Sequence, residues 1–407
     1  MSKLNIIIDG NYQMHRTLHT YEQLSPVKLD SEEDCGRFIR KLATDLCYTL
    51  RCIGRADRII WTIDCNSWRK KIDIDQNDGY KKNRSYSDDV NWENFSKLNK
   101  EFGKILEDAN CISTMINGME GDDLMYFWSN KFFEDEEDTL ILTGDRDITQ
   151  LVKCNDKNFI CVYNDNSKSH KLTAAKGFLD YINREDEVSL FDLDAALNNK
   201  KVMKEFSDRE DVVVEEIDPE DVIYEKIVSG DSGDNVPPIV TWTETQKTGK
   251  TVNRKITEKK AQAIKDQIIL EHAECDISDL SQYADIFTKQ IKEKLKQEID
   301  EDVVRDRLKR NTLLVWLDKQ TIPAELQEAF VDYYEECKMK GKPTWKTWRS
   351  ESVLEGTKYY QEKEMIDVQS DYFKIDTVQK KEKVSKKKTQ VDDDIDDILN
   401  MNLNALF

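Results

Sequence analysis

Short apolar runs alternate with helical periodicity over roughly the first 165 residues of the chain. Three runs have the continuous apolar character of strands buried on both faces, at residues 6–8, 59–63 and 140–142. Apolar positions recur at helical spacing over residues 35–53, 92–109 and 122–133, and further strands are predicted at 111–116 and 159–163. This alternation predicts an α/β fold with a mostly parallel central sheet and flanking helices.

Beyond this core, which we assign to residues 1–184, the pattern changes three times. Residues 185–221 hold 14 acidic and 4 basic residues and are predicted to form an irregular, acidic insertion. Residues 222–348 have helical periodicity without alternating strands, which predicts a second, helical domain. Residues 349–407 lose apolar periodicity and are predicted to be a charged, disordered tail. A chain of 407 residues is long enough for two such domains.

Acidic residues stand where the predicted parallel strands end. Asp9 and Asp64 directly follow apolar runs, and Asp145 comes shortly after a third. Because ligands of open α/β sheets bind beyond the carboxyl ends of the strands, carboxylates at these positions are expected to converge. Ionised carboxylates at close range need cations between them, and the hard divalent ions Mg²⁺ or Mn²⁺ suit oxygen ligands. The candidate metal ligands are Asp9, Asp64, Glu120, Asp122, Asp123, Asp145, Asp147, Asp231 and Asp234.

Each acidic block also has a purely structural explanation. Residues 120–123 open a predicted helix, where acids cap free N–H groups and suit the helix dipole. Residues 144–147 and 231–235 have the composition of ordinary turns. The combination of all blocks, in this order and at predicted strand ends, favours one functional site over separate capping and turn roles.

Composition limits the classes of protein to consider. The 61 Lys and Arg against 81 Asp and Glu give a net charge of −20, which by itself argues against a nucleic-acid partner. Nine cysteines without a C-x-x-C pair favour reduced thiols in a cytoplasmic location over a disulfide framework. We find no apolar run of membrane-spanning length and no signal peptide, and therefore expect no membrane partner.

The ordered motifs resemble those of the flap endonuclease/5′–3′ exonuclease family, and most closely its T-even phage ribonuclease H branch. The matching blocks are residues 8–11, 62–64, 80–84, 119–123, 143–151 and 230–235. The resemblance spans residues 4–335 and implies a PIN-like 5′ nuclease core followed by a helix–three-turn–helix domain that binds DNA. It also implies a metal-dependent phosphodiesterase that acts on 5′ ends, flaps and RNA primers and leaves 5′-phosphate products.

The same resemblance implies how the acidic residues divide between two Mg²⁺ ions, with Mn²⁺ as a possible substitute. Two metals about 4 Å apart can promote an in-line displacement at phosphorus. The first metal would be held by Asp9, Asp64, Glu120, Asp122, Asp123 and Asp145. The second metal would be held by Asp147, Asp231 and Asp234.

Two basic segments reverse the overall negative charge locally. The first lies within residues 66–90, where aromatic rings stand among lysines and arginines, a composition that suits single-stranded nucleic acid. The resemblance implies that it forms an arch for a 5′ single strand, with Lys81 and Arg84 as catalytic residues at the scissile phosphate. Its other predicted nucleic-acid contacts are Arg69, Lys70, Lys71, Tyr80 and Lys82. A solvated basic loop is the structural alternative.

The second basic segment covers residues 241–265, with seven basic and two acidic residues. The resemblance places the helix–three-turn–helix here, with phosphate contacts that give affinity without sequence preference. The predicted contacts are Lys247, Lys250, Arg254, Lys255, Lys259 and Lys260. The glycine-rich turn of cellular family members is replaced by residues 236–240 and a polar stretch, which leaves a bound monovalent ion open.

The apolar end of the tail follows five aspartates and is predicted to be a recognition peptide. Leu403, Leu406 and Phe407 are its candidate contacts with a sliding clamp or a single-strand-binding protein. Docking of this end on its own protein is the alternative.

The sequence as a whole predicts a monomeric, structure-specific 5′ nuclease of DNA replication, with ribonuclease H-type activity on RNA–DNA hybrids. Two alternatives stay open, a PIN-domain endoribonuclease and a catalytically silent scaffold that binds branched DNA. The sequence leaves the preferred substrate and the balance between exonuclease and endonuclease action undecided.

Overall fold

The computed structural model divides into two compact units, each described here by itself. It describes residues 3–22, 28–53, 56–74, 79–84, 87, 89–164, 169–182, 210–245 and 250–338. Unit 1 contains the described residues of 3–66, 87–217 and 328–338. Unit 2 contains the described residues of 67–84 and 218–327.

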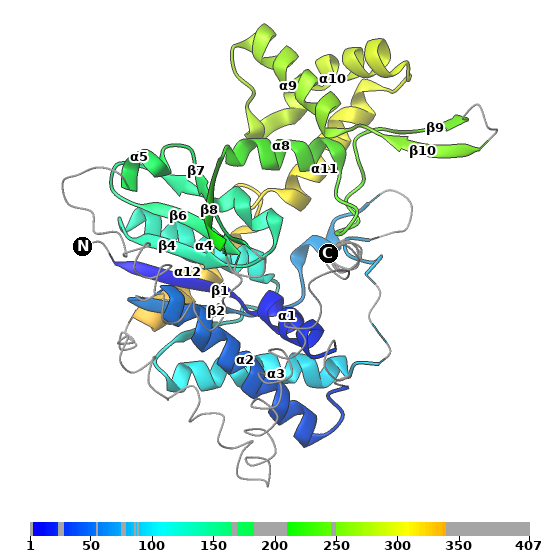
Figure 1. Cartoon of the computed structure of the whole chain (residues 1–407). Helices are drawn as coiled ribbons and strands as arrows, with labels where there is room; N and C mark the ends of the chain where they lie inside the picture. Colours follow the sequence, from blue (N-terminus) through cyan, green and yellow to red (C-terminus); the bar gives the residue numbers. More distant parts are fainter. Residues whose placement is uncertain are drawn as a thin grey trace. The chain divides into compact units, whose positions relative to one another are not determined.

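Unit 1 is built on a mostly parallel sheet with strand order β3-β2-β1-β4-β6-β7-β8, with β5 paired to β6 (Figure 1). The strands are β1 (Leu4–Asp9), β2 (Arg58–Thr62), β3 (Ile112–Thr114), β4 (Asp138–Leu142), β5 (Lys153–Cys154), β6 (Phe159–Asn164), β7 (Ser169–Ala175) and β8 (Glu210–Ile217). All neighbours from β3 to β6 along this order are parallel, whereas β7 is antiparallel to β6. The predicted fold class is confirmed, since β1, β2, β4 and β6 coincide with predicted strands.

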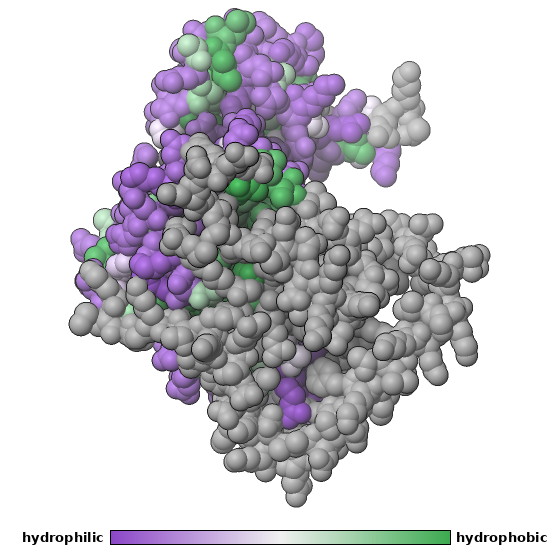
Figure 2. Space-filling model, turned by 60° about the vertical axis from the view of Figure 1, so that its left-hand side comes forward, coloured by the Kyte–Doolittle hydropathy of each residue, from purple (hydrophilic) through white to green (hydrophobic). Residues whose placement is uncertain are grey.

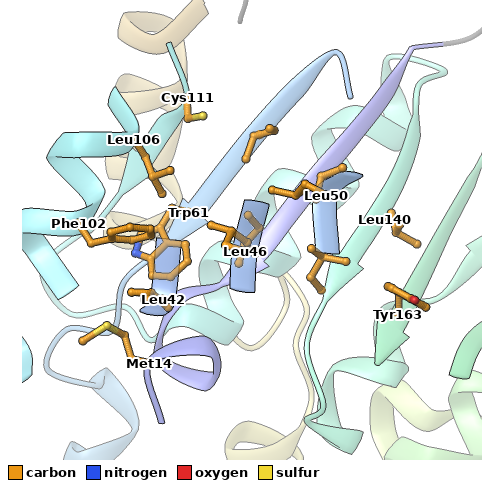
Figure 3. Close-up of a cluster of buried hydrophobic side chains, with 14 of the residues drawn as sticks. Met14, Leu42, Leu46, Leu50, Trp61, Phe102, Leu106, Cys111, Leu140 and Tyr163 are labelled. Carbon is orange, nitrogen blue, oxygen red and sulfur yellow. The ribbon is translucent and has the colours of Figure 1, made fainter. Parts of the chain in front are cut away.

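Helices cover both faces of this sheet. Ile6 and Ile8 join a buried cluster with residues of α1 (Gly10–Glu22), α2 (Glu32–Ile53) and α3 (Trp92–Asp108), whereas Ile7 lies outside it. This alternation follows from the two-residue period of a strand. Figure 3 shows the cluster, in which Trp61 of β2 lies among side chains of α1, α2 and α3. Helix α4 (Gly121–Glu134) contacts β1 and β4, and its buried side chains are not part of that cluster.

Helix α12 (Ala324–Lys338) brings the chain back to unit 1 after unit 2. Phe330 stacks on Phe127 with ring centroids 4.9 Å apart and meets Trp128 edge-on at 5.4 Å. Tyr333 donates a hydrogen bond to the backbone carbonyl of Ser113 in β3. Residues 328–338 therefore pack with the α/β core, although they fall within the range predicted as the second domain.

Unit 2 is mainly helical around its own core (Figure 1). It holds the 3₁₀ helix η1 (Trp68–Lys71), α8 (Pro219–Ser229), β9 (Thr241–Thr245), β10 (Thr251–Lys255), α9 (Glu258–His272), η4 (Ile277–Tyr283), α10 (Ala284–Gln290), the single-turn η5 (Ile291–Leu295), α11 (Glu301–Val315) and the first residues of α12. The predicted helical character is confirmed except at β9 and β10, which form a two-stranded ribbon. Figure 2 shows that the coloured surface of these helices is mostly hydrophilic.

Part of the predicted irregular insertion is a strand. Residues 210–217 form β8, which pairs in parallel with β7. The β-branched run around Val214, which packs against the main core, gives this stretch its strand character despite the surrounding acids. Residues 183–209 and the predicted tail at 349–407 lie outside the described residues. None of the seven cysteines whose side chains the structure describes forms a disulfide. No described helix combines the length and apolarity needed to cross a membrane.

Candidate functional site

Three acidic residues stand at the carboxyl ends of three adjacent parallel strands of unit 1. Asp9 is the last residue of β1, Asp64 follows β2 by two residues, and Asp145 follows β4 by three. The register pairs Asp9 with Thr62 of β2 and Ile8 with Leu142 of β4. Since β1 lies between the other two strands, the sheet delivers all three carboxylates to one edge, where ligands of such sheets bind.

Asp9 is the most buried of these acids, with 7% of its surface exposed. One carboxylate oxygen accepts a hydrogen bond from the backbone N–H of Tyr12 at 2.9 Å, and the other accepts one from the Thr143 hydroxyl at 2.8 Å. Burial, together with repulsion from Asp64 and Asp145, raises the pKa of Asp9 to about 7, against the opposing effect of the two hydrogen bonds. Asp64 and Asp145 therefore both act electrostatically on Asp9.

Thr143 connects two of the acids and was not identified from the sequence as a site residue. Its hydroxyl donates to Asp9 and accepts a hydrogen bond from the backbone N–H of Asp145 at 3.0 Å. Asp145 in turn caps the 3₁₀ helix η2 (Arg146–Leu151) by accepting from the N–H of Asp147 at 2.8 Å. The sequence signal that marks Thr143 is its place at the start of the matching block 143–151.

A second group forms around the beginning of α4. The side chain of Asp123 accepts a hydrogen bond from the N–H of Glu120 at 3.1 Å, and Asp64 accepts one from the N–H of Gly121 at 2.5 Å. A Cβ at Gly121 would lie 2.8 Å from the Asp64 carboxylate, so only glycine permits this approach. The helix N-terminus therefore binds Asp64, and Asp122 lies in the same first turn with intermediate exposure. The capping role considered for residues 120–123 is present in the structure, alongside this link to Asp64.

The other two predicted ligands belong to unit 2 and are engaged by basic residues there. Asp234 pairs with Arg84 at 2.5 Å and with Lys81 at 3.6 Å, and it accepts a hydrogen bond from the Tyr80 hydroxyl at 3.0 Å. Burial works to raise the pKa of Asp234, but the two cations and these hydrogen bonds outweigh it and lower the pKa to about 2. Asp231 pairs with Lys226 at 2.7 Å.

The segment around Lys81 docks on the loop around Asp234 through further hydrogen bonds. Asn235 donates to the carbonyl of Gly79 at 3.0 Å, and Asn83 donates to the carbonyl of Ser232 at 2.6 Å. The N–H of Lys81 donates to the carbonyl of Asp234 at 3.0 Å. Unit 2 thus brings together the sequence blocks 80–84 and 230–235, which are separated by about 150 residues of chain.

Two predicted nucleic-acid contacts of the first basic segment are in the interior. Tyr80 packs with Ile74 and Leu314, and Arg69 is 1% exposed with its guanidinium over the Trp68 ring. A base can stack only on an exposed ring, so the placement of Tyr80 corrects the predicted stacking role. Lys70, Lys71 and Lys82 are exposed, as their predicted role requires.

The second basic segment presents its cations to solvent. Exposed side chains are found at Lys250, Arg254, Lys255, Lys259 and Lys260. Lys247 and the predicted tail contacts Leu403, Leu406 and Phe407 lie outside the described residues. In the described part of the chain, no three His, Cys, Asp or Glu side chains have the spacing of a preformed metal site.

Unit 1 is thus an α/β domain of the class whose site is a set of carboxylates at the carboxyl edge of a parallel sheet. Residues 4–182 match the family model described as the 5′–3′ exonuclease N-terminal, resolvase-like domain. The match covers the strands and helices from β1 to α5 (Phe178–Ile182), which is less than half of the chain. A search of curated proteins found no match.

Solved structures of a bacteriophage T5 nuclease are also similar to this chain. The T5 protein co-crystallised with metal ions is 14% identical, with a TM-score of 0.44, over 88% of this chain and 99% of that chain. The T5 5′-exonuclease with bound zinc is 15% identical, with a TM-score of 0.44 and the same coverage. These identities are too low to assign residue roles.

Proposed function

We propose that the protein is a structure-specific 5′ nuclease that hydrolyses phosphodiester bonds at 5′ ends, flaps and RNA primers. The observation that carries the proposal is the delivery of Asp9, Asp64 and Asp145 to one edge by three adjacent parallel strands. The match of residues 4–182 to the 5′–3′ exonuclease N-terminal domain supports it independently. Within this class we propose that the protein belongs to the T-even phage ribonuclease H branch, because the six sequence blocks resemble those of that branch in order and content.

The donor set fits hard divalent cations, for which we propose two Mg²⁺ ions. The side chains at the site offer only oxygen atoms, and the mutual repulsion of Asp9, Asp64 and Asp145 is the kind that bound cations relieve. We assign Asp9, Asp64, Glu120, Asp122, Asp123 and Asp145 to the first ion, and Asp147, Asp231 and Asp234 to the second. When bound, such ions supply Lewis-acid activation for an in-line displacement at phosphorus.

The protein's own groups orient this site. The Thr143 hydroxyl fixes one oxygen of Asp9 and the backbone of Asp145, and the N–H of Gly121 fixes one oxygen of Asp64. These hydrogen bonds restrict the orientations that the Asp9 and Asp64 side chains can adopt. Lys81 and Arg84 would bind the scissile phosphate, and Tyr80 holds the segment that carries them.

We propose that the protein acts as a monomer in DNA replication in the cytoplasm of a phage-infected host. The C-terminal residues would bind a sliding clamp or a single-strand-binding protein, while the basic residues of unit 2 bind the substrate backbone.

The proposal is tested with end-labelled nicked, flapped and RNA-primed duplexes, incubated with Mg²⁺ or with EDTA. We expect Mg²⁺-dependent release of 5′-phosphorylated products from the 5′ end or the branch point. Cleavage of unstructured RNA without regard to a 5′ end would support a PIN-domain endoribonuclease instead. Tight binding of flapped DNA without any cleavage would support a catalytically silent scaffold.

A further inference from the structure

Asn11 lies beside the acidic site, and the proposed function gives it no role. It stands in the first turn of α1, two residues after Asp9, with intermediate exposure. A Cβ at the preceding Gly10 would lie 2.3 Å from the carbonyl oxygen of Thr62 and 2.7 Å from the Trp61 ring, so glycine lets α1 begin directly against β2. Asn11 is thereby held near the carboxyl ends of β1 and β2.

Two consecutive hydrogen bonds connect Asn11 to the interior of unit 1. The indole N–H of Trp61 donates to Oδ1 of Asn99 at 2.8 Å, and Nδ2 of Asn99 donates to Oδ1 of Asn11 at 2.6 Å. Trp61 is fully buried, and Asn99 on α3 is 3% exposed. The Trp61 ring also meets Phe102 edge-on, with ring centroids 5.0 Å apart (Figure 3). The inner end of this connection is therefore fixed by core packing.

The chemistry of the indole determines the orientation of both amides. An indole nitrogen can only donate, so the Asn99 atom that faces it must be the oxygen, and the nitrogen of Asn99 faces Asn11. The oxygen of Asn11 is therefore turned toward Asn99, and its N–H₂ group is directed elsewhere. Among the described residues, none accepts a hydrogen bond from this group. Unit 1 thus holds an oriented donor close to Asp9.

A bound substrate can supply the acceptor for this N–H₂ group. Hard divalent cations take oxygen ligands, so the amide nitrogen of Asn11 does not extend the proposed metal-ligand set. Asparagine amides are among the groups that donate to the phosphate oxygens of nucleic acids. A neutral donor also suits a position beside Asp9, because it carries no positive charge that would pair with the carboxylates. The donor is therefore suited to phosphate.

We infer that Asn11 donates through Nδ2 to a phosphate oxygen of the substrate strand near the branch point, and that Asn99 is the positioning residue that orients it. The inference rests on the proposed function for its substrate class. It adds a neutral substrate contact to a site described so far by carboxylates and cations. The structural alternative is a network that only ties α3 to α1 and β2, and the test separates the two.

Two single variants and their combination test the contact. Asn11→Ala removes the donor. Asn99→Asp presents only acceptors, so the amide of Asn11 has to turn over to donate to it, and its oxygen then takes the place of the N–H₂ group. Asn130→Ala is the control, because Asn130 on α4 has intermediate exposure and its amide also makes hydrogen bonds, to the carbonyl of Tyr126 and from Lys153. Far-UV circular dichroism shows whether each variant is folded.

Fluorescence anisotropy in EDTA measures the binding of 5′-flapped DNA without cleavage. We expect Asn11→Ala to weaken binding about fivefold and Asn130→Ala less than twofold, because the first variant alone loses a donor to phosphate. Asn99→Asp should weaken binding at least as much as Asn11→Ala. The double variant should bind no more weakly than Asn11→Ala, since Asn99 acts through Asn11. Additive effects of the two changes, or wild-type affinity of Asn11→Ala, would overturn the inference.

Substrates with one neutral methylphosphonate linkage locate the phosphate, and they decide the test if Asn99→Asp does not fold. The linkage is placed in turn at the branch point and at the two neighbouring positions. At one of them the fivefold difference between wild type and Asn11→Ala should fall below twofold, because the charged acceptor oxygen is missing. A difference that stays fivefold at all three positions would overturn the inference, since a purely structural defect weakens every substrate alike.

The nuclease assay with Mg²⁺ is read separately. Wild-type protein that shows this binding pattern but does not cleave flaps would contradict the proposed function and leave the Asn11 contact standing. Wild-type protein that cleaves, with an Asn11→Ala variant that binds flapped DNA normally, would contradict the Asn11 contact alone.

Discussion

At the residue scale, the site depends on carboxylates whose charges oppose one another. Asp9 is held by Tyr12 and Thr143 in a position where burial and two neighbouring acids disfavour its charge. This arrangement weakens the apoprotein at neutral pH, and it makes the site receptive to cations. The consequences for activity and for stability can be measured separately.

Asp145→Asn is expected to abolish cleavage and to leave binding of flapped DNA within a few-fold. Loss of one carboxylate from a metal-dependent site forfeits several kcal/mol of transition-state stabilisation, which corresponds to orders of magnitude in rate. Single-turnover cleavage and anisotropy measure the two effects. Asp180→Asn, at an exposed position of α5, is the control with the same charge change. A near-normal rate for Asp145→Asn would remove it from the metal set.

Asp9→Asn is expected to stabilise the metal-free protein at pH 8 relative to wild type. The pKa of Asp9 is raised to about 7, so the folded state binds more protons than the unfolded chain between pH 4 and 7. Its contribution to stability is therefore lost as the pH rises through this window, by about 1.4 kcal/mol for each pKa unit. Urea denaturation in EDTA at pH 4.5 and pH 8 measures the difference. If the free energies of unfolding of variant and wild type differed by the same amount at pH 4.5 and at pH 8, the predicted pH dependence would be contradicted.

Lys81→Ala is expected to lower the single-turnover rate far more than the affinity for flapped DNA. Its charge would act on the scissile phosphate as negative charge develops there. Lys259→Ala with Lys260→Ala should instead weaken duplex binding and reduce its salt slope by about one unit for each lost phosphate contact. Each variant is the control for the other, because Lys81→Ala should mainly change the rate and the double variant should mainly change duplex binding. If Lys81→Ala changed only binding, its catalytic assignment would fail.

At the element scale, α12 stabilises the helix that opens with Glu120. Phe330 is buried against Phe127 and Trp128 of α4, and Tyr333 binds the carbonyl of Ser113. The beginning of α4 in turn binds Asp64. A helix from the C-terminal part of the chain thus supports the element that orders part of the acidic site.

Phe330→Ala is expected to destabilise unit 1 by about 3–5 kcal/mol, the usual cost of removing a buried aromatic ring. Val331→Ala, at the next residue but 56% exposed, should change stability by less than about 0.5 kcal/mol. Urea denaturation followed by tryptophan fluorescence measures both variants. Similar stabilities of the two variants would show that α12 is not required for the packing of α4.

At the scale of the whole molecule, the sequence predicts what is local and misses what depends on distant partners. The buried strands could be identified because their apolar runs are continuous. Asp9, Asp64 and Asp145 could be expected at one edge of the sheet because each follows such a run directly or within three residues. The β9–β10 ribbon could not, because it buries almost nothing and so lacks the apolar alternation of a strand. Nor does local sequence reveal that Arg69 is buried or that Asp234 pairs with Lys81, since these depend on the folded arrangement of unit 2.

Removal of residues 391–407 is expected to keep nuclease activity on short oligonucleotides and to abolish stimulation by the cognate sliding clamp or single-strand-binding protein. The acidic and apolar end of the tail suits binding to a groove with a basic rim. Cleavage assays with and without each partner compare the full chain with the truncated one. Equal stimulation of both forms would assign the recruiting role to another part of the chain.

The return of α12 to unit 1 has a consequence for synthesis of the protein. The aromatic face of α4 is translated some 200 residues before Phe330, so it has no α12 to cover it while unit 2 is being made. Exposed apolar surface on a partly synthesised chain favours aggregation, which makes a nascent chain stopped near residue 182 a natural client of chaperones. A ribosome therefore has to complete unit 2 before unit 1 can reach its final packing.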